Sequence, residues 1–172
     1  MNKLAIGTLG SILGFIFAQL LSIYQFQKGI EISQKVEKIH LARELVKEFY
    51  AEDAIIFREL RTAVESCSQL YLGYKKGGKF NNDEINRYLG FFDDIGFYYR
   101  QGVLDLDIID QQFGAYIIEA NEYAELRRYI NELQENAKQQ SAFNNFRFLA
   151  EALEKLPGRK QLTEKSRQPC LL

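Results

Sequence analysis

Hydrophobic residues fill the start of the chain, and a mixed pattern of hydrophobic and charged residues follows after residue 27. The run at residues 4–26 contains no charged residue and no proline. A helix of this length measures roughly 35 Å, which is enough to cross a hydrocarbon core of about 30 Å. The pattern therefore predicts a transmembrane helix at residues 4–26, preceded by a short flank at residues 1–3.

From residue 31 to about residue 72, hydrophobic residues recur at alternating steps of three and four, which is typical of one long helix with an apolar face. Asp53 is the one charged member of this series. The face could pair with a second copy in a coiled coil, or it could pack against later helices of the same chain. Leu45, Ile55 and Phe57 widen it beyond a narrow coiled-coil seam, and this width favours packing within the chain.

The remaining chain shows the same helical spacing in separate segments. Asn82 is a suitable first cap after a glycine-rich stretch, and Gly102 and Pro157 are suitable stops. The sequence therefore predicts an all-α domain at residues 30–156, a bundle of about four helices with one long first helix, followed by a disordered basic tail at residues 157–172. The predicted helices cover residues 31–72, 83–101, 106–137 and 142–156.

The distribution of basic residues predicts which side of a membrane the domain occupies. Four basic residues follow the apolar run within about 20 positions, a distance over which basic flanks tend to stay cytoplasmic: Lys28, Lys35, Lys38 and Arg43. Lys3 alone precedes the run, and the two cysteines are consistent with reduced thiols. We expect a single-pass protein of the inner, cytoplasmic membrane with its domain in the cytoplasm.

Small residues recur at four-residue spacing inside the apolar run, at Gly10, Gly14 and Ala18. Small residues on one face allow two membrane helices to approach closely. This face is a candidate for self-association, and a homodimer is therefore one expected partner. The alternative is that glycine is simply common in membrane helices.

The charge balance limits the other partners. The formal net charge is −1, and this value gives no electrostatic reason to expect nucleic-acid binding. Lys75, Lys76 and Lys79 could contact anionic lipid, as could the basic tail. The expected partners are therefore membrane lipid and an unidentified protein, with no nucleic acid.

The residue inventory excludes several chemistries. His40 is the single histidine, so a di-iron bundle site, a structural zinc site and a serine or cysteine triad all lack ligands or bases. Gly73 to Lys79 imitates a phosphate-binding loop, but Phe80 stands where that loop requires a hydroxyl. We therefore expect no catalytic, cofactor-binding or metal-binding residues.

Asp93 and Asp53 are the candidate buried polar residues. Asp93 and Asp94 are adjacent on a helix, so their side chains point about 100° apart and do not aim at one small site. A buried Asp93 would need a donor, and four arginines are candidates: Arg87, Arg100, Arg127 and Arg128. A structural ion pair is favoured over a metal site.

The segment Arg87 to Gly96, RYLGFFDDIG, together with Gly102-Val-Leu-Asp105, resembles a family of uncharacterised bacterial proteins. Its members pair an N-terminal membrane helix with a helical domain that carries a Leu-x-Phe-Phe-acidic-x-Ile helix and a Gly-x-Leu-Asp turn. Asp93 matches the acidic position, whereas Gly90 stands where a polar residue is expected. The resemblance covers residues 82–130 and implies fold and topology but no reaction.

These observations favour a membrane-anchored helical module for interaction or signalling, without catalysis of its own. One alternative is an acidic metal-dependent enzyme that uses Asp93 and Asp53. The other is a membrane-perturbing toxin or lysis helper.

Overall fold

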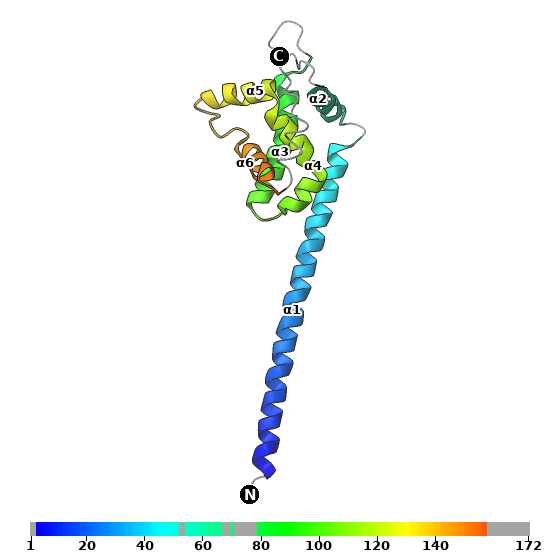
Figure 1. Ribbon diagram of the computed structural model, residues 1–172, viewed down its shortest axis with the longest axis vertical. Helices are drawn as coiled ribbons and strands as arrows, with labels where there is room; N and C mark the ends of the chain where they lie inside the picture. Colours follow the sequence, from blue (N-terminus) through cyan, green and yellow to red (C-terminus); the bar gives the residue numbers. More distant parts are fainter. Residues whose placement is uncertain (1–2, 52–53, 67–69, 71–78, 158–172) are drawn as a thin grey trace. The chain divides into compact units, whose positions relative to one another are not determined.

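A computed structural model describes residues 3–51, 54–66, 70 and 79–157, and for residues 3–18 it describes the helical backbone but not the side chains. Every element among these residues is an α-helix (Figure 1). The helices are α1 Lys3–Phe49, α2 Ile55–Glu65, α3 Asn82–Arg100, α4 Leu106–Glu122, α5 Ala124–Glu135 and α6 Asn144–Glu154.

The chain divides into two compact units, with the boundary between His40 and Leu41. The first unit contains the larger part of α1, and its described apolar side chains, such as Leu20 and Phe26, are exposed. The second unit contains the end of α1 and all the other helices. Every buried hydrophobic residue among the described side chains, from Ala42 to Leu153, belongs to this second unit.

The described helices contradict the predicted transmembrane helix at residues 4–26. Among the described residues, none of the helices has both the length and the apolarity that a membrane crossing needs. α1 does not end with the apolar run but continues to Phe49 through charged residues such as Lys28 and Glu31.

The bundle of about four helices is also a wrong prediction, because two of the predicted helices are each divided. In place of one helix at residues 31–72, α1 ends at Phe49 and α2 begins at Ile55. Positions eight apart lie about 12 Å apart along a continuous helix. The rings of Phe49 and Phe57 instead stack with centroids 5.7 Å apart, and both contact Phe91. The break between α1 and α2 therefore allows two aromatic residues of one apolar face to contact the same partner.

The second division separates α4 from α5 at Tyr123, within the predicted helix at residues 106–137. Tyr123 has extended backbone angles, with φ −68° and ψ 118°, and its side chain is buried. Leu126 and Ile130 of α5 are buried as well. The bend thus directs the apolar face of α5 into the core, although neither glycine nor proline stands at the bend.

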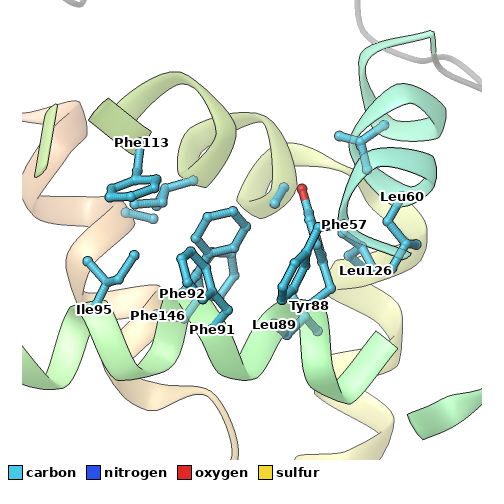
Figure 2. Close-up of a cluster of buried hydrophobic side chains, with 14 of the residues drawn as sticks. Phe57, Leu60, Tyr88, Leu89, Phe91, Phe92, Ile95, Phe113, Leu126 and Phe146 are labelled. Carbon is cyan, nitrogen blue, oxygen red and sulfur yellow. The ribbon is translucent and has the colours of Figure 1, made fainter. Parts of the chain in front are cut away.

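α3 supplies the centre of the core, which Figure 2 shows. Phe92 stacks on Phe146 of α6 with centroids 6.1 Å apart, and Phe91 meets Phe113 of α4 edge to face at 5.8 Å. Such aromatic pairs contribute about 0.5–1.5 kcal/mol each beyond the burial of their area. Tyr88 and Ile95 complete the buried side of the helix. The outward faces of α3 are therefore held in fixed positions.

The first turn of α3 follows from its local sequence. Asn81, one residue before the predicted cap Asn82, accepts a hydrogen bond from the backbone N–H of Glu84 at 3.0 Å. The Glu84 carboxylate accepts one in return from the backbone N–H of Asn81 at 2.8 Å. This capping box satisfies two backbone donors at the start of the helix.

Candidate functional site

Asp93 of α3 caps the start of α6. One carboxylate oxygen accepts a hydrogen bond from the backbone N–H of Phe146 at 2.9 Å, and the other accepts one from the Asn145 side-chain amide at 3.1 Å. Phe143, at the N-cap position of α6, has a left-handed φ of 57° and no hydroxyl or carboxyl group to serve as a cap. A carboxylate beside free backbone N–H groups is favourable, because the helix dipole is positive at this end. Asp93 therefore serves as a cap supplied from another helix.

Two neighbours on the same face of α3 complete the contact with α6. Arg100 donates a hydrogen bond to the Asn145 side-chain oxygen at 2.8 Å. Gly96 permits the close approach, since a Cβ atom there would lie 2.3 Å from the Asn145 carbonyl oxygen. Arg100 thus binds Asn145, and the ion pair expected between Asp93 and an arginine is replaced by amide donors.

The other predicted site residues lie outside the described part of the chain. Asp53 falls in the undescribed segment 52–53, and Gly10, Gly14 and Ala18 lie in the part of α1 for which only the helical backbone is described. Asp93 itself is half-buried. Within the described residues, no three His, Cys, Asp or Glu side chains lie close enough together to hold a metal ion.

A groove opens on a different face of α3, where the end of α1 and α2 lie against it. Its volume is about 310 Å³. Leu45, Phe57 and Phe91 form an apolar floor, and each of them is at most 8% exposed. The backbone at Gly90 faces open space in this groove, since a Cβ atom there would meet nothing within 4 Å. We call this feature the Gly90 groove.

Charged side chains of both signs line the rim of the Gly90 groove. Arg87 lies on the Phe57 ring, with its guanidinium carbon 5.8 Å from the ring centroid. Among the described residues, the side chains of Arg87, Glu48 and Asp94 form no hydrogen bond or ion pair with one another or with any other group. Partial burial, and then the neighbouring Asp93 carboxylate, raise the pKa of Asp94. A cation placed beside Asp94 would therefore relieve an unfavourable charge.

A second cluster of polar and aromatic groups is already filled by the chain itself. The Arg61 guanidinium lies 5.1 Å from the ring centroid of Tyr50 and 5.4 Å from that of Tyr116. The Tyr50 hydroxyl donates to the Tyr116 hydroxyl at 2.9 Å, and partial burial raises the pKa of Tyr50. Arg61 also forms an ion pair with Glu65, with Arg61 Nε 3.7 Å from Glu65 Oε1. Arg61 of α2 and Tyr116 of α4 are thereby held together.

Sequence reasoning did not identify the Gly90 groove, although a signal was present. Arg87, Gly90 and Asp94 are spaced by three and four residues, so they share one face of a helix. A glycine inside a helix, flanked on its own face by opposite charges, indicates an open surface. Leu45, Glu48 and Phe57 give no such signal, because only the tertiary fold brings them to α3.

Residues 12–153 match the family described as "Domain of unknown function (DUF4760)". The match covers well over half of the chain, and the chain therefore belongs to this family. No curated protein and no solved structure matches the chain. The predicted membership of an uncharacterised family is therefore confirmed. The Leu-x-Phe-Phe-acidic-x-Ile helix and the Gly-x-Leu-Asp turn, as motifs of that family, stay predictions.

Proposed function

We propose that this member of the DUF4760 family is a helical protein-interaction module without catalysis of its own, and that the Gly90 groove is its binding surface. The observation that carries this proposal is the rim of the groove. Arg87, Glu48 and Asp94 have no hydrogen-bond or ion-pair partner among the described residues, and they line the groove beside its apolar floor.

This combination is typical of binding surfaces between proteins. Interfaces commonly place an apolar anchor in a central pocket and surround it with polar contacts. The floor of the Gly90 groove is aromatic and rigidly packed, since Phe57 and Phe91 contact each other with centroids 5.3 Å apart. Binding would therefore require little reorganisation, which lowers its entropic cost.

The chemistry of the lining supports binding rather than catalysis. The described residues that line the groove include no histidine, cysteine or serine, so neither an activated nucleophile nor a histidine base is available there. The two carboxylates belong to different helices, Glu48 to α1 and Asp94 to α3. In the alternative of an acidic metal-dependent enzyme, Asp93 would have to bind a metal, but both of its carboxylate oxygens already accept hydrogen bonds from α6.

A photo-crosslinking experiment tests the proposal. A photoreactive amino acid replaces Asp94 in the full chain, and in a matched control it replaces Glu151, which is exposed on α6. After illumination in the native host, the Asp94 position is expected to yield a discrete protein adduct that the Glu151 position does not. Adducts that are equal at both positions, or no protein adduct at Asp94, would contradict the proposal.

Several expectations from the sequence stay predictions. These are contact of basic residues with lipid, self-association through Gly10, Gly14 and Ala18, and a cytoplasmic location of the helical domain. A homodimer formed through the Gly90 groove would be a separate contact, and the crosslinking experiment would reveal it as an adduct of twice the chain mass.

A further inference from the structure

We infer that the partner of the Gly90 groove is an amphipathic helix that carries an acidic and a basic residue seven positions apart, with an apolar residue between them. This inference rests on the proposed function and adds the chemistry of the partner. Three observations support it: the spacing of the charges on α3, the apolar floor between them, and the open backbone at Gly90.

The spacing of the rim charges matches the repeat of a helix. Arg87 and Asp94 are seven residues apart on α3, which corresponds to two helical turns and about 10 Å along the axis. A partner helix lying along α3 presents its own side chains at the same repeat. If an acidic residue of the partner helix lies opposite Arg87, the partner residue seven positions along therefore lies opposite Asp94.

The floor of the groove selects the residue between the two charges. Gly90 lies midway between Arg87 and Asp94, and a Cβ atom there would meet nothing within 4 Å. Phe91, Phe57 and Leu45 border this space. An apolar side chain of the partner, placed three or four positions from its acidic residue, would enter the groove and be removed from water. Glu48 provides a second carboxylate for the basic end of the partner.

Peptide binding to the full chain tests this inference. The probes are four alanine-based helical peptides that share a central leucine and differ only in the residues that flank it at seven-residue spacing. The flanking pairs are Glu with Lys, Lys with Glu, Glu with Glu, and Lys with Lys. We expect at least one of the two mixed-charge peptides to bind at least tenfold more tightly than either same-charge peptide, measured by isothermal titration calorimetry.

Variants of the protein check that the groove is the binding surface. Arg87→Glu makes the rim wholly acidic and is expected to shift the preference to the Lys-Lys peptide, whereas the matched control Arg127→Glu on exposed α5 surface leaves the preference unchanged. Gly90→Leu places a large side chain in the groove and is expected to weaken the binding of every peptide by at least tenfold. Its circular dichroism spectrum is expected to remain that of the unaltered chain.

The outcomes separate this inference from the proposed function. Equal binding of all four peptides, a preference that Arg87→Glu does not change, or no peptide binding at all would overturn the inference. If protein adducts form at Asp94 while no mixed-charge peptide is preferred, the proposed function stands and the helical partner is rejected. If adducts at Asp94 are absent as well, both proposals are rejected.

Discussion

Asp93 and Asp94 are adjacent carboxylates with different surroundings. Asp93 accepts two hydrogen bonds from α6, whereas Asp94 has no hydrogen-bond donor among the described residues. We expect Asp93→Asn to lower the free energy of unfolding by about 1–3 kcal/mol, because one of the two N–H donors then faces an amide N–H₂ group and loses its acceptor. Urea denaturation followed by circular dichroism measures this loss.

The matched control is Asp94→Asn on the same helix. Removing that charge should leave the stability unchanged or raise it slightly, because partial burial and Asp93 already raise the pKa of Asp94. Equal losses of stability in the two variants would show that the charge of this acidic pair matters and that the capping contact does not.

Glu119 of α4 gives a prediction for pH dependence. Partial burial, followed by the carboxylates of Glu65 and Glu122, raises the pKa of Glu119 above its ordinary value of 4.5. The folded state therefore binds this proton more readily than the unfolded state. The resulting contribution to stability is complete below pH 4.5 and is lost as pH rises through the raised value. Ionised Glu119 thus opposes folding at neutral pH.

We accordingly expect Glu119→Gln to raise the melting temperature at pH 7 and to lose this advantage as the pH falls below about 4.5. Thermal unfolding at a series of pH values checks both the sign and the pH range. Glu151→Gln, on exposed surface of α6, is the control and should show no such dependence. A Glu119→Gln variant that is less stable at pH 7 would contradict the prediction.

At the level of elements, the contact of α3 with α6 depends on the missing side chain of Gly96. A Cβ atom at this position would lie 2.3 Å from the Asn145 carbonyl oxygen and 2.6 Å from its carbonyl carbon, and backbone cannot move aside as a flexible side chain can. We expect Gly96→Ala to destabilise the protein by about 1–3 kcal/mol, the usual cost of overpacking. Chemical denaturation measures this effect.

Gly90→Ala is the matched control, since it changes the same residue type in the same helix. The added Cβ atom meets nothing within 4 Å, and alanine has a higher helix propensity than glycine by about 1 kcal/mol. This variant should therefore be as stable as the unaltered chain or more stable. Similar destabilisation by both substitutions would mean that helix geometry, and not contact with α6, decides the outcome.

Helix boundaries were predictable where the sequence itself contains the signal. The pattern predicts a helix at residues 83–101, and α3 covers Asn82–Arg100. Its start is set by the reciprocal contacts of Asn81 and Glu84, and its end is followed by Gly102 with a φ of +69°. The divisions after Phe49 and at Tyr123 were not predicted, because neither glycine nor proline marks them. Distant packing partners such as Phe91 determine them instead.

The candidate site shows the same limit. The sequence singled out Asp93 but not its partners, since Asn145 and Phe146 are more than 50 residues away in the chain. The sequence spacing of Arg87 and Asp94 already places them on one face of α3. Glu48 lies far from them in the chain, and only the tertiary fold brings it to the same groove. Local patterns thus predict which residues share a helix face, and tertiary packing decides what that face meets.

At the level of the whole molecule, the two units differ in how their apolar residues are used. In the first unit, which ends at His40, the described side chains of Leu20, Ile23 and Phe26 are 60%, 53% and 69% exposed. In the second unit, the hydrophobic core extends from Ala42 to Leu153. The buried residues at the end of α1 therefore belong energetically to the second unit.

This division predicts where the chain can be shortened. We expect residues 41–172 to unfold in one cooperative thermal transition, because every buried hydrophobic residue of the described chain remains in this fragment. A fragment that begins at Ile55 lacks Phe49, whose ring lies within 5.8 Å of the rings of Phe57, Phe92 and Phe113. Losing a buried phenylalanine typically costs about 3–5 kcal/mol, a large part of the stability of an ordinary domain. The shorter fragment should therefore show a weak thermal transition or none in differential scanning calorimetry. A cooperative transition equal to that of residues 41–172 would contradict the assignment of the end of α1 to this core.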